Sequence, residues 1–331
     1  MLREHTPRLP AGAGGTRAVS ALRLGTRASL LATTQSGHVA DALRAATGRD
    51  VELVPITTAG DVLTGPLAQL GGTGVFVAAL RDALLRGDCD LVVHSMKDLP
   101  TGDVPGLQIA AVPARASARD ALCARDGLSL DELPQGARVG SGSPRRVAQL
   151  LRRRPDLDVA GIRGNVDTRL RKVDEGEFDA IVLAEAGLTR IARTARITEL
   201  FADGAWPTSA GQGALAVEVR SGDAIGADVA LISETASAEV ALLERAVLRR
   251  LEAGCAAPVG IGASHVPGDD RVALVAEVYA LDGARAVRVE RTFARTAVAD
   301  EAGRAHAADV VVTELLDAGA GDLADLAGSS R

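Results

Sequence analysis

The sequence predicts an α/β protein with two similar α/β lobes and a smaller α+β domain at its C-terminal end. Three observations predict this fold class. With 331 residues, the chain is too long for one compact core. Short apolar runs alternate with helical patterns through the first two thirds of the chain, which is typical of α/β domains. After Leu251 the pattern changes to successive strands followed by a helix, which is typical of an α+β domain.

The expected elements follow from these patterns in chain order. Strands of the α/β part are expected at 21–25, 51–57, 91–94, 108–112, 138–140, 159–162 and 180–183. Helices are expected between them at 30–47, 75–86, 144–153 and 166–175. A further strand at 215–220 could return to the first sheet. The C-terminal domain is expected to hold a helix at 236–251, antiparallel strands at 272–281 and 286–293, and a helix from about Asp300 to Leu316.

The chain therefore divides into three expected domains with two tails. Domain 1 comprises 20–115 and 211–232, domain 2 comprises 116–210, and domain 3 comprises 233–317. A disordered extension is expected at 1–19 and a flexible tail at 318–331, where Gly, Ala, Asp and Ser predominate. Two lobes joined by short crossovers leave a cleft between them, which is a common place for small-molecule sites.

Composition excludes several classes of protein. The net charge is −6 and aromatic residues make up 2%, which argues against nucleic-acid binding. No apolar run approaches the length of a membrane span, and no apolar signal segment follows the N-terminus, so we expect a cytoplasmic protein. Three widely spaced cysteines support neither a disulfide framework nor a metal site. We expect a monomer that binds a small molecule.

The segment LVVHSMKDLP, residues 91–100, is the strongest local signal. A buried strand ends in polar residues, among them Ser95, Lys97 and Asp98, at the edge where open α/β sheets place their ligand sites. The chain has only two lysines, Lys97 and Lys172, among 37 basic residues. Because nearly all basic residues of this chain are arginines, a lysine next to an aspartate suggests a specific chemical role. The alternative is an ordinary surface Lys–Asp pair.

Three strand-to-helix junctions carry arginine. LGTRAS (24–29), GSGSPRR (140–146) and RGNVDTRL (163–170) each place arginine near a helix start, where backbone amides already favour anions. Two cations in the first turn of a helix are unfavourable unless an anion binds there. Together the junctions predict a ligand with several carboxylates or phosphates. Ser29 and Ser143 are expected to cap the helices that follow them. The alternative at each junction is a capped helix with solvated arginines. The candidate residues are Arg27 and Ser29, then Ser143, Arg145 and Arg146, then Arg163 and Arg169, with Arg190 as a weaker member.

Two further motifs lie near the expected cleft. In LEAGCAAPVG (251–260), Gly254 is expected to end a helix, so Cys255 would stand on a loop from which a thiol can reach a cleft. The alternative is a buried structural cysteine. AGQGA (210–214) indicates only a hinge or a closely packed crossover.

Taken together, these segments resemble the porphobilinogen deaminase (hydroxymethylbilane synthase) family. VHSMKDLP, GSGSPRR, RGNVDTRL, AGQGA and LEAGCAAPVG occur in the family's order and spacing, and the match runs from about Leu22 to the last strands and helix. The resemblance implies two lobes like those of periplasmic binding proteins and a small domain carrying the cysteine. It also implies a cytoplasmic transferase of porphyrin and heme biosynthesis that joins four porphobilinogens into hydroxymethylbilane.

The resemblance also implies the roles of single residues. Cys255 would hold a dipyrromethane cofactor through a thioether, and Asp98 would be the catalytic carboxylate. The cofactor's acetate and propionate groups would be bound by Ser95, Lys97, Ser143, Arg145 and Arg146. The substrate and growing chain would be bound by Arg27, Ser29, Arg163, Arg169 and Arg190. No metal is implied.

Some positions depart from the family pattern. Gln69, Thr73 and Ala59 stand where basic residues are common, and Glu185 stands where a small residue is usual. Residues alone also allow a non-catalytic α/β binding protein or sensor for a polycarboxylate, in which Asp98 and Cys255 would have no purpose. The missing signal segment weakens that reading.

Overall fold

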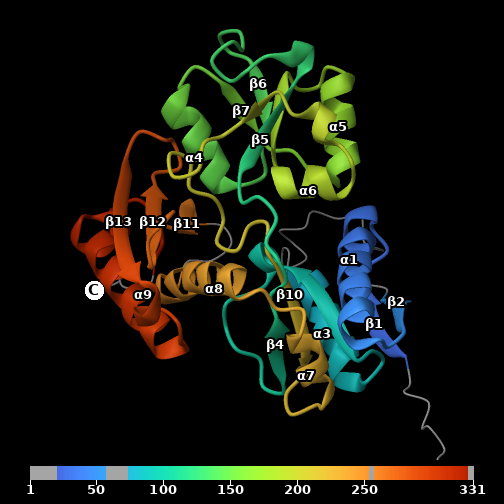
Figure 1. Ribbon diagram of the computed structural model, residues 1–331. Helices are drawn as coiled ribbons and strands as arrows, with labels where there is room; N and C mark the ends of the chain where they lie inside the picture. The colour runs from blue at the N-terminus through green and yellow to red at the C-terminus, as the bar shows by residue number, and fades with distance from the viewer. Residues whose placement is uncertain (1–20, 57–73, 253–256, 327–331) are drawn as a thin grey trace, which may run out of the picture.

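The computed structural model describes residues 21–56, 74–252 and 257–326. These residues form two α/β lobes and a smaller C-terminal domain, each built on its own sheet (Figure 1). The predicted fold class, two α/β lobes followed by an α+β domain, is therefore confirmed. Among the described residues, no helix is long and apolar enough to cross a bilayer.

The first lobe contains a five-stranded sheet in the order β2-β1-β3-β10-β4. β1 pairs parallel with β2 and β3. β10 returns to this sheet, as the sequence suggested, and it runs antiparallel between β3 and β4. Helices α1, α3 and α7 accompany this sheet. The strands are β1 Leu22–Thr26, β2 Val51–Pro55, β3 Leu91–Ser95, β4 Leu107–Ala111 and β10 Leu215–Arg220, and the helices are α1 Leu30–Thr47, α3 Gly74–Arg86 and α7 Ile225–Ala230.

The second lobe contains a five-stranded sheet in the order β7-β6-β8-β5-β9. β6 pairs parallel with β7 and β8, while β5 runs antiparallel to β8 and β9. The strands are β5 Asp120–Ala124, β6 Arg138–Gly140, β7 Asp158–Ala160, β8 Ala180–Ala184 and β9 Glu199–Leu200, and the helices are α4 Pro144–Arg153, α5 Val166–Asp174 and α6 Glu185–Arg190.

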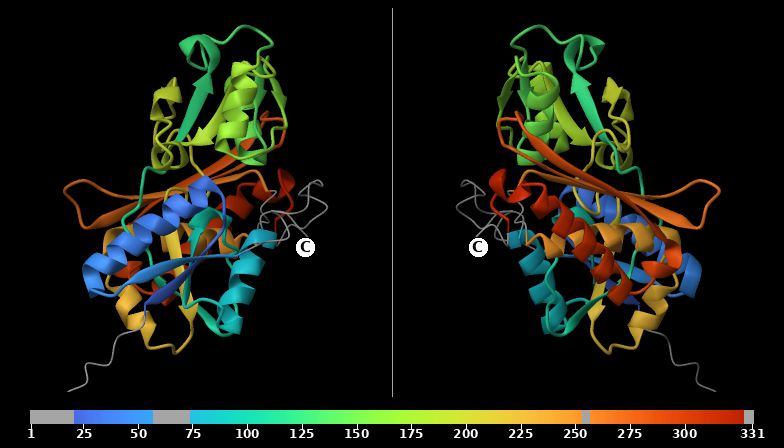
Figure 2. Two further views of the ribbon diagram at one scale, coloured as in Figure 1. Left: turned by 90° about the vertical axis from the view of Figure 1, so that its right-hand side faces the viewer. Right: turned by 90° about the vertical axis from the view of Figure 1, so that its left-hand side faces the viewer.

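The C-terminal domain packs two helices on an antiparallel three-stranded sheet. Its core joins apolar residues of both helices, such as Leu243 and Val311, to strand residues such as Ile261 and Leu274. Figure 2 shows the orange hairpin of this sheet running beneath the second lobe. The elements are α8 Thr235–Arg250, β11 Val259–His265, β12 Arg271–Tyr279, β13 Ala286–Ala294 and α9 Glu301–Asp317.

The expected elements within the described residues are present with boundaries shifted by a few residues, and five further ones were missed. β5 was missed because it begins with a charged residue, Asp120, and is only five residues long. β11 contains two glycines, which are depleted in strands. α6 and α7 have six residues each, too few to show a helical period, and β9 has two.

The chain crosses between the lobes twice, once before β5 and once before β10, and the two crossovers touch. Ala116 N donates to Gly213 O at 3.3 Å. Gly213 has φ +84°, and a Cβ there would lie 2.4 Å from Ala116 O. Glycine is required at this position because only it fits both the conformation and the close approach. The AGQGA motif is therefore the closely packed crossover that the sequence indicated.

Candidate functional site

Strand β3 delivers the first part of the site. Lys97 and Asp98 lie in a 3₁₀ turn, Met96–Asp98, directly after it, and both are half-buried. Ser95 Oγ accepts a hydrogen bond from Gln35 Nε2 of α1 at 2.9 Å. Arg245 of α8 holds the turn from the C-terminal domain by donating to the carbonyl oxygens of Leu99 at 2.8 Å and Pro100 at 2.9 Å. The polar strand end predicted from LVVHSMKDLP is confirmed as a fixed turn.

The first turn of α4 delivers two buried cations. Arg145 is 2% exposed and Arg146 is 7% exposed. The carboxylate of Asp120, at the start of β5, lies 2.9 Å from Arg145 Nη1 and 2.6 Å from Arg146 Nη2. The anion that the sequence required at this helix start is thus supplied in part by the chain itself. Ser143 occupies the N-cap position, but its side chain makes no capping hydrogen bond, so the expected cap is wrong.

Asp120 has no exposed surface, and four donor side chains contact its carboxylate. Besides the two arginines, Trp206 Nε1 donates to it at 3.0 Å and Gln212 Nε2 at 2.8 Å. Burial raises the pKa of the Asp120 carboxyl, but the charges of Arg145 and Arg146 outweigh it and lower that pKa below its usual range. Asp120 is therefore a permanent anion within the cation cluster.

Gln212 joins the two lobes at this point. Its Oε1 accepts from Lys97 Nζ in the first lobe and from Arg146 Nη2 in the second, both at 3.4 Å. Its Nε2 also donates to Ala118 O at 2.7 Å. The second crossover thus places the turn after β3 beside the first turn of α4.

Positive charge is in excess around this junction. The pKa of Lys97 is lowered to about 8, mainly by burial and also by the charges of Arg146 and Arg145, while Asp98 and Asp120 oppose the shift. Burial also lowers the pKa of Arg169, with contributions from Arg146 and Arg163 that Asp98 opposes. Arg169 Nε donates to Gly164 O at 2.8 Å. The structure therefore brings residues from the predicted segments 91–100, 140–146 and 163–170 into one electrostatic cluster. Its members are Lys97, Asp98, Arg145, Arg146, Arg163 and Arg169.

Arg190 lies elsewhere. Its Nη2 donates to Gly213 O at 2.6 Å, and it lines a cavity of about 730 Å³ between α1, α6 and the first crossover. Glu185, the departure at the start of α6, accepts hydrogen bonds from Ser117 and Arg119 in that crossover. Arg190 thus contacts the second crossover one residue beyond Gln212, and burial alone accounts for the lowering of its pKa.

The remaining predicted residues are placed by the local fold or lie outside it. Arg27 follows β1 and is half-buried, and Ser29 caps α1 by accepting from Ala32 N, which confirms the predicted cap. Cys255 lies outside the described residues, as do Ala59, Gln69 and Thr73.

Three guanidinium nitrogens at the first turn of α4 are buried and have no hydrogen-bond partner among the described residues. They are Nε and Nη2 of Arg145 and Nε of Arg146. A buried donor without an acceptor costs free energy comparable to a lost hydrogen bond. Such donors fit carboxylate groups, which accept from guanidinium edges in pairs. The site is therefore suited to a ligand with several carboxylates.

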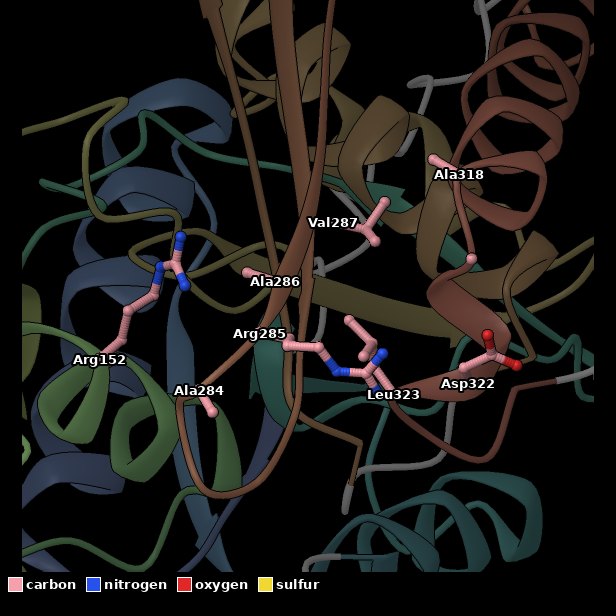
Figure 3. A pocket seen from close by; sticks show the side chains of 9 residues that line it. Arg152, Ala284, Arg285, Ala286, Val287, Ala318, Asp322 and Leu323 are labelled. Atoms are coloured by element: carbon pink, nitrogen blue, oxygen red, sulfur yellow. The ribbon is translucent and has the colours of Figure 1, made fainter.

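The sequence missed Asp120, Gln149 and Gln212. Asp120 was overlooked because its partners are 25 and 26 residues away in the sequence, and Gln212 gave only a crossover signal. A smaller cavity, of about 400 Å³, lies at the other end of α4 between Arg152, the β12–β13 turn and the end of α9 (Figure 3). No group of three or more His, Cys, Asp or Glu side chains that could hold a metal occurs in the described part of the chain.

Comparison with known proteins gives consistent matches. Residues 22–227 match the family model "Porphobilinogen deaminase, dipyromethane cofactor binding domain", and residues 238–310 match "Porphobilinogen deaminase, C-terminal domain". The porphobilinogen deaminase of Leifsonia xyli subsp. xyli is 53% identical over 94% of this chain and 97% of its own length. That of Thermobifida fusca is 53% identical over 84% of this chain and 87% of its own. Among solved structures, the methionine-binding protein MetQ aligns with a TM-score of 0.42 at 13% identity, over 68% of this chain and 93% of that chain.

Proposed function

The chain belongs to the porphobilinogen deaminase family, and from this premise we propose which of its residues carry the reaction. It is a transferase of porphyrin and heme biosynthesis that condenses four porphobilinogen molecules, with loss of ammonia at each addition. The product is the linear tetrapyrrole hydroxymethylbilane, built on a dipyrromethane cofactor. The observation that carries our assignment is a cluster of cations beside the carboxylate Asp98, in which Arg145 and Arg146 are buried and three of their guanidinium nitrogens have no partner among the described residues.

The residues present fit the dipyrromethane cofactor. Its acetate and propionate groups need donors in an enclosed place, and the unpartnered N–H groups of Arg145 and Arg146 supply them. Lys97 adds an ammonium group and Ser95 and Ser143 add hydroxyls nearby in the fold. In our proposal Cys255 holds the cofactor through a thioether, and the bound cofactor supplies the pyrrole to which each new unit is joined.

Asp98 is the proposed catalytic residue. Loss of ammonia from the aminomethyl group of porphobilinogen leaves a cation, which a fixed carboxylate in a partly buried site stabilises. The same carboxylate can accept the proton that must leave the attacked ring carbon when the pyrrole becomes aromatic again. The charge of Asp98 acts on both Lys97 and Arg169, which places the carboxylate within the cation cluster.

The other arginines are proposed to bind the incoming unit and the growing chain. Arg163, just before α5, and Arg169, within α5, add positive charge to the cluster from the second lobe. Arg27 and Ser29 stand at the start of α1 in the first lobe. Arg190 contacts the crossover and not the cluster, so among these residues it has the weakest structural support.

We also propose the division of the chain. Domain 1 would comprise 20–115 and 211–232, domain 2 would comprise 116–210, and domain 3 would comprise 233–317. The strands of the three sheets fall within these limits, which supports them. We propose further that the enzyme is a cytoplasmic monomer without a nucleic-acid partner.

Replacing Asp98 by Asn tests the catalytic role. We expect tetrapyrrole formation per cofactor-loaded molecule to fall by about a hundredfold or more, because an amide cannot supply the negative charge. Intact-protein mass, compared between this variant and Cys255→Ser, reports how many molecules carry the cofactor at Cys255. Asp103→Asn is the matched control, since it removes an exposed ion pair with Arg249 near the same turn. A loss of less than about tenfold in Asp98→Asn, roughly 1.4 kcal/mol, would contradict the role.

A further inference from the structure

Arg245 of α8 is a buried cation without an ion pair. It is 9% exposed, and no carboxylate in the described part of the chain lies within ion-pair distance of its guanidinium. Burial lowers the pKa of Arg245 to about 10, and the negative charge of Glu218 opposes this shift. Glu218 is itself paired with Arg81 at 2.7 Å. The guanidinium is therefore charged near neutral pH, and its close contacts are made with other groups.

The hydrogen bonds of Arg245 go to the main chain on both sides of Asp98. Its Nη1 donates to Met96 O at 3.3 Å and to Leu99 O at 2.8 Å, and its Nη2 donates to Pro100 O at 2.9 Å. A guanidinium can bind several oxygens at once because its N–H groups form a rigid planar fork, whereas a lysine ammonium is a compact point charge. One side chain thus contacts three carbonyl oxygens that flank the proposed catalytic residue in the sequence.

The two sides of this turn are held by different groups. On the strand side, Met96 N donates to Ala214 O at 3.0 Å, which continues the pairing of β3 with β10. Leu99 N bonds back to Met96 O at 3.1 Å, which closes the turn without tying it to another element. On the far side, the carbonyl oxygens of Leu99 and Pro100 accept no hydrogen bond from any described residue other than Arg245. Arg245 is therefore the hydrogen-bonding anchor on that side.

One face of α8 is built against the turn. Ala241 belongs to an apolar cluster with the buried side chains of Met96 and Leu99, and Arg245 follows it by four residues on the same face of the helix. The small alanine side chain lets α8 lie close to the turn, so that the guanidinium can reach the carbonyl oxygens. Another face of α8 contributes to the core of the C-terminal domain, and the helix lies between that domain's sheet and the first lobe (Figure 1). The C-terminal domain therefore contacts the turn that carries Asp98.

We propose that Arg245 is a positioning residue for Asp98, through which the C-terminal domain fixes the catalytic turn. A carboxylate stabilises a developing cation best when it is held in place beforehand, and a displacement of about 1 Å can cost about a hundredfold in rate. An apolar side chain in place of Arg245 would fill the space, but it would not hold the peptide groups of Leu99 and Pro100. This inference rests on the proposed catalytic role of Asp98.

The test measures the addition of pyrrole units to the loaded enzyme. Protein that already carries the cofactor is mixed with porphobilinogen, and intact-protein mass gives the rate of addition over a range of substrate concentrations. We expect Arg245→Met to lower the maximal rate by about tenfold, because the carboxylate is no longer held in place. The substrate concentration at half the maximal rate should change by less than about twofold, because Arg245 is buried and acts through the main chain.

A matched control and a second variant accompany this change. Arg249→Met removes an exposed guanidinium one turn further along α8, which pairs with Asp103 in the same loop, and its rate should stay within about twofold of the parent. Arg245→Lys keeps the positive charge but not the planar fork, so we expect a loss of about threefold. This variant carries the test if Arg245→Met does not fold. An unchanged rate in either Arg245 variant would overturn the proposal.

Combination with Asp98→Asn separates positioning from a general loss of stability. Once the charge at position 98 is gone, there is no carboxylate to hold in place, so adding Arg245→Met should slow addition by less than about twofold more. A further loss of about tenfold in the double variant would overturn the proposal. The premise is tested by the single variants: normal addition in Asp98→Asn would refute the role of Asp98, whereas impaired addition there with normal addition in Arg245→Met would refute only the role of Arg245.

Discussion

The indole Nε1 of Trp206 donates a hydrogen bond to Asp120 Oδ2 at 3.0 Å, and Trp206 is the only tryptophan of the chain. The indole stacks on Phe201 with ring centroids 4.1 Å apart. Asp120 is the shared counter-ion of Arg145 and Arg146, so the single tryptophan is bonded directly to the charge that balances the proposed cofactor site. Its fluorescence therefore reports on this site without any label.

Replacing Asp120 by Asn should destabilise the protein strongly. The change leaves two buried guanidinium groups without their anion, and breaking a buried ion pair from one side costs about 3–5 kcal/mol. Urea unfolding followed by Trp206 fluorescence measures the loss. Asp131→Asn, which removes an exposed pair with Arg153, is the control and should cost far less, because an exposed ion pair contributes little to stability. Equal stability of the two variants would show that Asp120 is not the counter-ion we infer.

The pH dependence of cofactor attachment should reflect Lys97. Burial lowers its pKa from 10.5 to about 8 in the folded protein, so the lysine is charged in both states below pH 8. Between about pH 8 and 10.5 the unfolded chain binds a proton that the folded chain lacks, and the contribution of this group to stability rises with pH there. Over the same window the folded protein loses a cation that attracts carboxylates.

Attachment of the cofactor to the cofactor-free protein should therefore slow as the pH rises through about 8. Lys97→Arg should move this decline to higher pH, because a guanidinium stays charged throughout the range. The measurement is the initial rate of mass gain at several pH values. A profile that is the same for the parent and for Lys97→Arg would exclude Lys97 as the titrating group.

The arginines should divide into two kinetic classes. Arg145→Leu should impair attachment of the cofactor, since Nε and Nη2 of Arg145 have no hydrogen-bond acceptor among the described residues. Arg169→Leu should leave attachment intact and stall elongation at intermediate lengths, with effects of about tenfold to a hundredfold per lost charge-assisted contact. Native mass spectrometry after limited addition of porphobilinogen distinguishes the two. Normal elongation in Arg169→Leu would remove that residue from the substrate site.

Hydrophobic patterns within short segments predicted most strands and helices. The features they missed depend on contacts between residues far apart in the sequence. The alternation around Leu91 predicts β3 correctly because a buried strand next to polar residues is visible within ten residues. β5 was not visible, since Asp120 begins it and is compensated by Arg145 and Arg146 from another element. The sequence likewise showed that cations start α4, but not that the chain supplies part of their counter-charge.

The hydrogen bond from Gln149 Nε2 to Tyr279 Oη, at 2.9 Å, illustrates the same limit. The two residues are separated by 130 positions, and each alone looks like an ordinary core or helix residue. Only the packing of the β12–β13 hairpin on α4 brings them together. Side-chain partners of this kind depend on the tertiary arrangement and leave no periodic signal.

The position of β10 between β3 and β4 has a consequence for synthesis on the ribosome. β4 pairs with no strand except β10 in the described part of the first sheet, and β10 follows the entire second lobe in the chain. The first lobe therefore cannot complete its sheet when its early strands leave the ribosome. β4 has no strand to pair with until the second lobe and β10 have been translated. Because domains generally fold as units during synthesis, the second lobe can fold before the first is closed. An unpaired strand edge persists through this interval, which makes it the period of greatest exposure to chaperones and to aggregation.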